Sequence, residues 1–235
     1  MNKNRLSYRG GFCIFNAEGL LRKRLSPSRI FFFSHKLYRN TFAKGGIYMA
    51  IKIYIDQGHN AMNPNAGAEG SGYREQDLVY YIGKELESLL NANPNFEAIT
   101  SRNSPTEVLG TSLATSLSSR VNEANTWGAD YFISLHANAS NIASASGSEA
   151  YVYSTSSPAY VLAQDILLRL SEATGLADRG VFERPTLYVL RKTAMPALLL
   201  EVGFITNASD AAMMAENPAL IARGIYNGIL TYFGM

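Results

Sequence analysis

Three apolar runs of this chain each lead into a side chain that can bind a metal ion or move a proton. In the first run, Ile51, Ile53 and Ile55 alternate with other residue types, which is the period of a strand that buries one face. The first run, residues 51–57, leads through Gly58 to His59. The second, residues 131–135, leads to His136, and the third, residues 197–200, leads to Glu201. In open α/β sheets, ligands bind beyond the carboxyl ends of the strands. We therefore expect these three side chains to meet at one edge of a sheet.

From Met49 onward, strand-like runs alternate with segments whose apolar residues recur at helical spacing, which is typical of an α/β domain. The expected helices are residues 75–91, 117–127 and 158–174, and a last one from Pro218 onward. The expected strands are residues 51–57, 96–100, 131–135, 148–154, 187–190 and 197–200. The Ser/Thr-rich segment 101–116 is predicted to be a loop. The pattern predicts a three-layer α/β/α fold around a twisted, mostly parallel mixed sheet of about six strands.

Charge divides the chain into two parts. Residues 1–48 carry ten Lys/Arg and one acid, Glu18, whereas residues 49–235 carry the other eleven Lys/Arg and eighteen Asp/Glu. The first part therefore has a net charge of +9 and the second part −7, although the whole chain has only +2. An acidic second part argues against a nucleic-acid partner, and the asymmetry indicates two parts with different origins or roles.

The basic first part shows no sustained strand or helix period. Its longest apolar run, residues 30–33, is shorter than the roughly 7 to 15 residues at the centre of a secretory signal. We interpret residues 1–48 as an unstructured basic leader, translated from sequence upstream of a natural start at Met49. The Lys-Gly-Gly of residues 44–46 can be encoded by codons that contain a bacterial ribosome-binding sequence. The alternative is a basic arm that binds anionic wall polymers or a membrane surface.

Composition excludes two further classes of protein. No run approaches the roughly 18 consecutive apolar residues of a membrane span, so we expect no integral membrane segment. Cys13 is the only cysteine, which excludes a disulfide framework within the chain.

Residues 49–235 contain two histidines and no cysteine, so a tight zinc site there has to use both His59 and His136. Hydrolytic zinc sites commonly have three protein ligands, and two His with one carboxylate is one recognised set. Glu69 and Glu75 are both candidates for the carboxylate, and we favour Glu75 because the start of a helix holds a ligand more rigidly than a glycine-flanked loop does. The competing interpretation of each histidine is a hydrogen-bonded structural residue.

Four sequence blocks follow one another in the second part of the chain. They are Ile55-Asp-Gln-Gly-His59, Gly72-Tyr-Arg-Glu75, Ser134-Leu-His-Ala-Asn138 and Glu201-Val-Gly-Phe-Ile-Thr-Asn207. Together they resemble the zinc-dependent N-acetylmuramoyl-L-alanine amidases of the amidase type 3 family, which cut bacterial peptidoglycan. The resemblance implies that His59, Glu75 and His136 hold zinc. It also implies that Glu201 is the catalytic acid/base, and that the fold is a twisted sheet with helices on both faces.

The family pattern and this chain differ in one segment. Residues 103–116 look longer and richer in Ser and Thr than the family pattern, which affects the local substrate-facing loop rather than the metal site.

Glu201 can also be assigned a role by chemistry alone. Zinc activates water and polarises an amide carbonyl, and a nearby carboxylate can then carry the proton to the leaving amine. Because Glu201 follows a buried apolar run, loss of hydration should raise its pKa towards the range of a general base. The alternative is a structural carboxylate paired with Arg120, although we expect Arg120 to tie a loop in place through bidentate hydrogen bonds.

The resemblance implies peptidoglycan as the partner, and hydrolysis of the amide between the lactyl carbonyl of N-acetylmuramic acid and the first L-alanine of the stem peptide. Two alternatives stay open: a carboxypeptidase-like or deacetylase-like zinc enzyme that acts on another amide, and a wall-binding module without catalysis. We expect a monomer, made in the cytoplasm without a recognisable signal peptide, that acts on the cell wall after lysis or release.

The interpretation of residues 1–48 can be tested directly. A chain that begins at Met49 should unfold at the same temperature and hydrolyse purified cell walls at the same rate as the full chain, because the leader is not expected to bury apolar surface. Sequencing the gene gives a second test. A clear loss of stability or hydrolysis in the shorter chain, or codons that lack AGGAGG before Met49, would contradict the interpretation.

Overall fold

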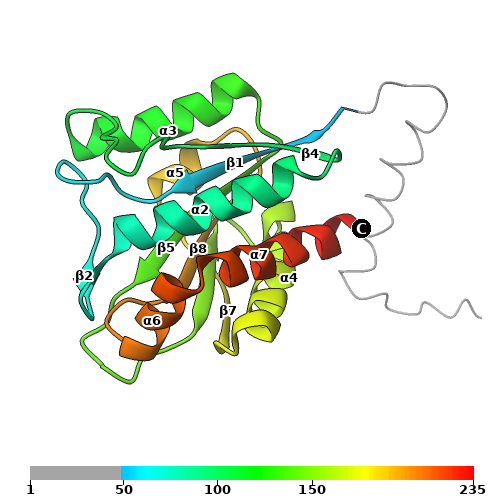
Figure 1. Cartoon of the computed structure of the whole chain (residues 1–235). Helices are drawn as coiled ribbons and strands as arrows, with labels where there is room; N and C mark the ends of the chain where they lie inside the picture. Colours follow the sequence, from blue (N-terminus) through cyan, green and yellow to red (C-terminus); the bar gives the residue numbers. More distant parts are fainter. Residues whose placement is uncertain (1–48) are drawn as a thin grey trace, which may run out of the picture.

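A central sheet of six strands runs through residues 49–235, which are the part of the chain that this computed structural model describes (Figure 1). The strands are β1 (Ile51–Gln57), β4 (Phe96–Thr100), β5 (Tyr131–Asn138), β6 (Ser148–Val152), β7 (Asp178–Glu183) and β8 (Ala197–Phe204). Their order across the sheet is β4-β1-β5-β8-β6-β7. The first four are mutually parallel, whereas β6 and β7 run in the opposite direction. The predicted mostly parallel mixed sheet is confirmed; the expected leader, residues 1–48, lies outside the described residues.

Helices cover both faces of the sheet, which confirms the predicted three layers (Figure 1). One face packs against α2 (Glu75–Asn91), α4 (Pro158–Thr174), α6 (Ala208–Glu216) and α7 (Pro218–Phe233). The other face packs against α3 (Leu113–Trp127) and α5 (Tyr188–Lys192). A short hairpin of β2 (Glu69–Gly70) and β3 (Tyr73–Arg74) precedes α2. Among these described helices, none is both long and apolar enough to cross a membrane.

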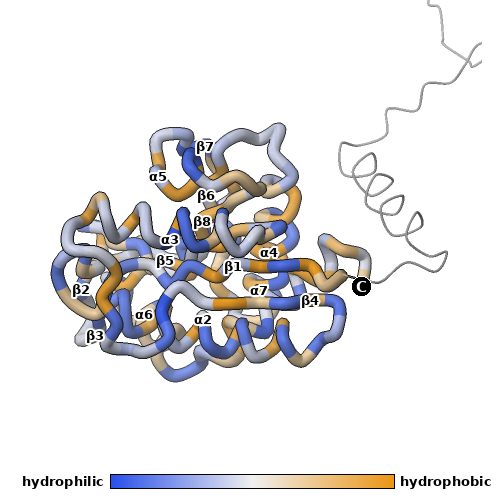
Figure 2. Tube along the Cα trace, turned by 90° about the horizontal axis from the view of Figure 1, so that it is seen from above, coloured by the Kyte–Doolittle hydropathy of each residue, from blue (hydrophilic) through white to orange (hydrophobic). Residues whose placement is uncertain are grey.

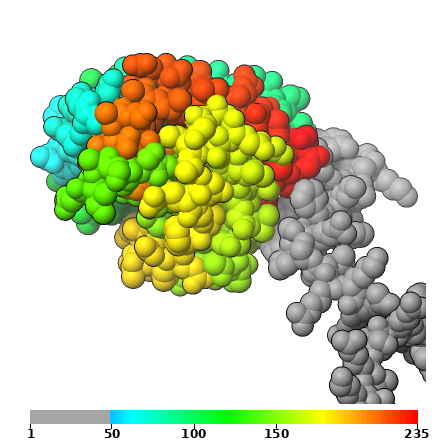
Figure 3. All heavy atoms as spheres, turned by 90° about the horizontal axis from the view of Figure 1, so that it is seen from below, coloured from blue at the N-terminus to red at the C-terminus, as the bar shows by residue number. Residues whose placement is uncertain are grey.

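Apolar periodicity explains why each helix packs as it does. Figure 2 shows orange apolar residues and blue hydrophilic residues alternating along the chain, as expected for elements that bury one side. Helix α7 packs closely against α4, and the two lie side by side in the space-filling view, in red and yellow (Figure 3). Gly228 permits this contact, because a Cβ atom there would lie 2.4 Å from Ile166 Cα of α4.

Local sequence signals define the ends of the helices. The Ser157 side chain accepts a hydrogen bond from the Ala159 amide at the start of α4, and Gly175 ends the helix with a φ of 75°. Ser112 forms a reciprocal capping box with Thr115, so α3 begins at Leu113. The predicted start of this helix at residue 117 was therefore too late.

Three other expectations about the elements differ from the structure. The strand predicted at residues 187–190 is wrong, because this short apolar run forms helix α5, and a run of four residues does not distinguish a strand from a buried helical turn. The edge strand β7 was missed because its first residues, Asp-Arg-Gly, are polar and include a glycine. Helix α6 was missed because its nine residues are too few to show a clear period.

The topology brings several strand ends to one edge of the sheet. Strands β1, β5 and β8 are parallel neighbours, so their carboxyl ends lie together. Strand β6 pairs with β8 in the antiparallel sense, so its first residues, rather than its last, reach the same edge. Functional side chains can therefore come from the ends of three strands and from the start of a fourth.

Candidate metal centre and active site

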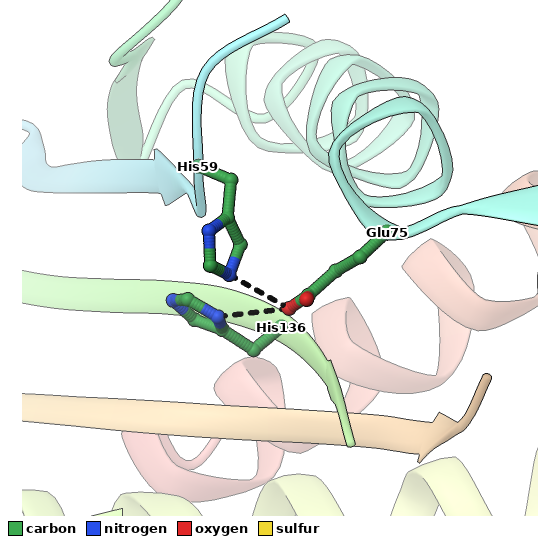
Figure 4. A group of neighbouring side chains, drawn as sticks. All are labelled: His59, Glu75 and His136. Carbon is green, nitrogen blue, oxygen red and sulfur yellow. Dashed lines mark hydrogen bonds and ion pairs between the residues drawn. The ribbon is translucent and has the colours of Figure 1, made fainter. Parts of the chain in front are cut away.

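Three potential metal ligands from separate parts of the chain meet at this edge. His59 follows β1, Glu75 is the first residue of α2, and His136 lies in β5. Figure 4 shows both imidazole rings directed at the Glu75 carboxylate. His59 Nε2 lies 3.2 Å and His136 Nδ1 lies 3.0 Å from Glu75 Oε1. The ligand atoms of all three lie within 4.8 Å of one another.

Glu75 is held in place by backbone groups as well as by the two rings. The Ala137 amide donates to Glu75 Oε1 over 3.0 Å, and the Ala68 amide donates to Oε2 over 2.9 Å. Burial alone would raise the pKa of Glu75, but hydrogen bonds with His136 and His59 and the charge of these rings hold it well below its usual range. The side chain is therefore an ionised carboxylate, the form that binds cations.

The two candidate carboxylates, Glu69 and Glu75, lie in different places in the structure, and Glu75 is the one in the cluster. Glu69, the other candidate, is exposed in the β2–β3 hairpin and is not part of the cluster. Glu75 projects from a helix start, and its carboxylate is held by four groups, which are the His59 and His136 rings and the Ala68 and Ala137 amides.

The turn between β1 and His59 allows the His59 and His136 rings to lie close together. His59 has a φ of 67°, in the left-handed region that few non-glycine residues adopt. A Cβ atom on Gly58 would lie 2.5 Å from His136 Cε1 and 2.7 Å from the Leu135 carbonyl oxygen. Only glycine at position 58 therefore allows the two histidines to approach each other, with ring centroids 4.8 Å apart.

A buried ion pair beneath the site fixes this turn. Arg120 of α3 donates to Asp56 Oδ1 over 2.5 Å and to the Gln57 carbonyl oxygen over 2.7 Å. Its other terminal nitrogen donates to the His59 carbonyl oxygen and to Asn60 Oδ1. Both charged side chains are almost fully buried. Arg120 thus ties the loop through several hydrogen bonds, and it pairs with Asp56 rather than with Glu201.

Glu201 lies beside the cluster on β8. It is the register partner of His136 on β5, so the two side chains lie on the same face of the sheet. Burial raises the pKa of Glu201 to about 7, and its buried Oε2 has no hydrogen-bond partner within the described residues. An unpartnered carboxyl group with such a pKa is suited to both accepting and donating a proton near neutral pH.

A second carboxylate next to Glu201 was not singled out from the sequence. Glu149 of β6 is the other register partner of Glu201. Its Oε1 accepts from Asn138 over 2.9 Å and from Tyr151 over 2.5 Å, and its Oε2 accepts from Arg179 over 2.8 Å. The only signal in the sequence was an acid at the start of an otherwise apolar alternating strand.

The pKa values of these two neighbouring carboxyl groups differ in direction. Burial raises the pKa of Glu149, but the hydrogen bonds from Arg179 and Tyr151 outweigh this effect and hold it below its usual range. Glu149 is thus a fixed anion, whereas Glu201 can change its protonation state. Neighbouring carboxyls with divergent pKa values are a common mark of acid/base sites.

The donor set fits a metal ion. Two imidazole nitrogens and one carboxylate oxygen, from the turn after β1, the strand β5 and the start of α2, are the ligands of one recognised class of catalytic zinc site. The charge of the Glu75 carboxylate offsets part of the charge of a divalent cation, and the Ala68 and Ala137 amides orient it.

The fold and the site together define an α/β protein with a His-Glu-His cluster and an adjacent carboxyl group at the active edge of its sheet. The family model described as N-acetylmuramoyl-L-alanine amidase matches residues 53–231, so this chain belongs to that amidase family. The family expected from the four sequence blocks is confirmed, and with it a peptidoglycan amidase activity.

Individual relatives agree with this assignment. The chain is 36% identical over 189 residues to the sporulation-specific N-acetylmuramoyl-L-alanine amidase of Bacillus subtilis (strain 168), covering 79% of this chain and 69% of that protein. It is 31% identical to the endolysin of Bacillus phage SPP1, covering 77% of this chain and 65% of that protein.

Solved structures show the same fold. The catalytic domain of CwlV, an N-acetylmuramoyl-L-alanine amidase from Bacillus (Paenibacillus) polymyxa var. colistinus, matches with a TM-score of 0.68 at 32% identity, covering 79% of this chain and 99% of that chain. An N-acetylmuramoyl-L-alanine amidase from Clostridium difficile 630 matches with a TM-score of 0.70 at 30% identity, covering 79% of this chain and 97% of that chain.

The buried ion pair gives a stability prediction. Replacing Arg120 with Met should lower the free energy of unfolding by about 3 to 5 kcal/mol, because Asp56 would stay buried without its partner charge. The matched control is Arg169→Met, which breaks an ion pair with Glu172 whose side chains are 38% and 53% exposed, and which should cost much less. Urea denaturation of both variants measures the difference. Equal losses would show that the buried pair has no special role.

Proposed function

We propose that this protein is a zinc-dependent amidase that hydrolyses the bond between the lactyl carbonyl of N-acetylmuramic acid and the first L-alanine of the stem peptide. The observation that carries the proposal is the convergence of His59, Glu75 and His136, with the ionisable Glu201 beside them. Membership of the amidase family supports the choice of substrate. The partner is thus peptidoglycan.

His59, Glu75 and His136 would hold the zinc ion. When bound, zinc supplies a Lewis acid that activates water and polarises the amide carbonyl. The ionised state of Glu75 and the backbone amides that hold it keep the ligand set ordered. Gly58 and Arg120 keep His59 at the required place in the turn.

Glu201 would move the proton. Its carboxylate accepts a proton from the attacking water and delivers it to the nitrogen of the leaving alanine, so the carboxylate is regenerated within one turnover. The absence of a fixed partner at Oε2 among the described residues leaves this oxygen free for both transfers. The raised pKa, about 7, makes the two transfers comparably favourable at neutral pH.

Two rival functions make different predictions. A carboxypeptidase-like or deacetylase-like enzyme could use the same ligands, but digestion of purified wall would then release different end groups. A wall-binding module would have no need for the unpartnered Glu201 beside the histidines, and it would release no amines. We further propose that the protein, made in the cytoplasm, meets its wall substrate after lysis or release, and that it acts as a monomer.

The metal prediction concerns stoichiometry and ligand identity. The purified protein should hold about one zinc ion per chain, and His59→Ala, Glu75→Ala and His136→Ala should each remove most of it. Glu69→Ala is the matched control and should keep the metal, because Glu69 is exposed outside the cluster. Metal analysis after dialysis measures this. Loss of zinc from Glu69→Ala but not from Glu75→Ala would show that the ligand set is wrong.

A second prediction separates metal binding from catalysis. Glu201→Gln should keep the zinc and the fold, but it should lower the rate of wall hydrolysis by about 10² to 10⁴, the usual contribution of a positioned acid/base. The readouts are metal content, thermal unfolding and the release of new amino termini from purified peptidoglycan. Turnover close to that of the unmodified enzyme would remove Glu201 from the mechanism.

A further inference from the structure

The side chains of the site follow one another in a fixed order across the sheet, from the metal ligands to Arg179. The ligands His59 and His136 come from β1 and β5, the acid/base Glu201 from β8, and Glu149 and Arg179 from β6 and β7. In the proposed reaction, the carbonyl lies on the metal side, and the leaving nitrogen receives its proton from Glu201. A leaving peptide that continues from this nitrogen in the same direction passes over β6 and β7, which lie beyond β8 in the sheet.

An irregularity in β7 directs Arg179 towards this region. Ser148 pairs with Asp178 but Ala150 pairs with Val181, so Arg179 and Gly180 together face only one residue of β6. Such a bulge re-aims a side chain, and bulges are common next to active sites. Gly180 has a φ of 101°, which a residue with a side chain rarely adopts.

The guanidinium of Arg179 is held on several sides and free on one. Its Nε donates to Glu149 Oε2 over 2.8 Å, and its Nη1 donates to the Ser146 carbonyl oxygen over 3.2 Å. Its Cζ lies 5.0 Å from the centre of the Phe204 ring. Within residues 49–235 the remaining nitrogen, Nη2, makes no hydrogen bond, and the side chain is 40% exposed.

Stability alone does not explain this arrangement. The pair joins a largely buried Glu149 side chain, 10% exposed, to an Arg179 side chain that is 40% exposed, so pairing with Glu149 leaves part of the guanidinium open to solvent. A planar guanidinium with a fixed orientation and a free donor is a common receptor for a carboxylate. Glu149 already accepts hydrogen bonds from Asn138 and Tyr151 on its other oxygen. Glu149 therefore orients Arg179 without needing all of its donors.

We propose that Arg179 is a specificity-determining residue that binds a carboxylate on the leaving peptide of the substrate. This inference rests on the proposed function. Neighbouring strands lie about 4.8 Å apart, so β7 is roughly 10 Å from β8. An extended peptide covers that span in about three residues. The recognised group is thus a carboxylate within about three residues of the cleaved amide.

The test uses soluble N-acetylmuramoyl-L-alanyl peptides that are identical except that each carboxylate beyond the alanine is replaced, one at a time, by a carboxamide. With the zinc-loaded full chain, one such replacement should lower kcat/KM about tenfold or more, mainly through KM, because a charge-assisted hydrogen bond is lost. Arg179→Gln should lower kcat/KM by a similar factor on the carboxylate peptide but hardly at all on that carboxamide peptide. The discrimination would then disappear.

The control is Arg184→Gln, which removes a nearby exposed arginine that contacts the Tyr151 ring but not Glu149. This variant should keep the discrimination. Thermal unfolding and zinc content check that each variant is folded. If Arg179→Gln does not fold, Arg179→Lys replaces it in the test: this variant keeps the charge but loses the planar fork, so it should discriminate less between the two peptides.

Three results would overturn the proposal. They are equal rates for all peptides with the unmodified enzyme, full discrimination in both Arg179 variants, and an equal loss on carboxylate and carboxamide peptides, which would indicate a purely structural role. If the unmodified enzyme cleaves none of the peptides at the muramoyl amide, the proposed function itself fails, and the inference fails with it.

Discussion

The buried pair of Arg120 and Asp56 is the interaction on which the active edge depends. It joins α3 to the end of β1 and holds the backbone from Gln57 to Asn60, in which His59 adopts a left-handed conformation. Removing two charges from water is costly unless nearly all their hydrogen-bonding capacity is used, and here Ser134 also donates to Asp56. The strained turn is therefore stabilised by a network outside the metal cluster. This network fixes the position of the His59 backbone, and so the position of the His59 ring in the cluster.

Much of the fold could be predicted from sequence, because apolar alternation and helix-end signals are local. The helix from Glu75 to Asn91 and the run into His136 are clear in the sequence, and so is the argument for Glu75 from its place at a helix start. The strand predicted at residues 187–190 failed, because a short buried run has the same composition in either structure. Residues in β7 gave no signal, because its edge position makes its sequence polar.

The parts of the candidate site that depend on strand register could not be predicted from the sequence. The pairing of Glu149 with Glu201, and of Arg179 with Glu149, joins residues that are far apart in sequence. No local pattern encodes which residue lies opposite which across the antiparallel β6–β8 pair or the parallel β6–β7 pair, and a shift of one residue would have placed these side chains on the other face. Burial raises the pKa of Glu201, as the apolar run before it predicted, whereas the lowered pKa of Glu149 depends on the register that brings Arg179 to it.

The reversal of strand direction between β8 and β6 separates the metal ligands from Arg179 on the edge strand β7. On the parallel side, the metal ligands and their supporting ion pair share one compact network, so few substitutions there leave it intact. On the antiparallel side, the groups that would face the peptide sit on an edge strand with solvent beyond it. Substitutions on the edge strand β7 leave the metal ligands and Glu201 in place, which makes this strand the natural place for engineering a new peptide preference onto the same hydrolase.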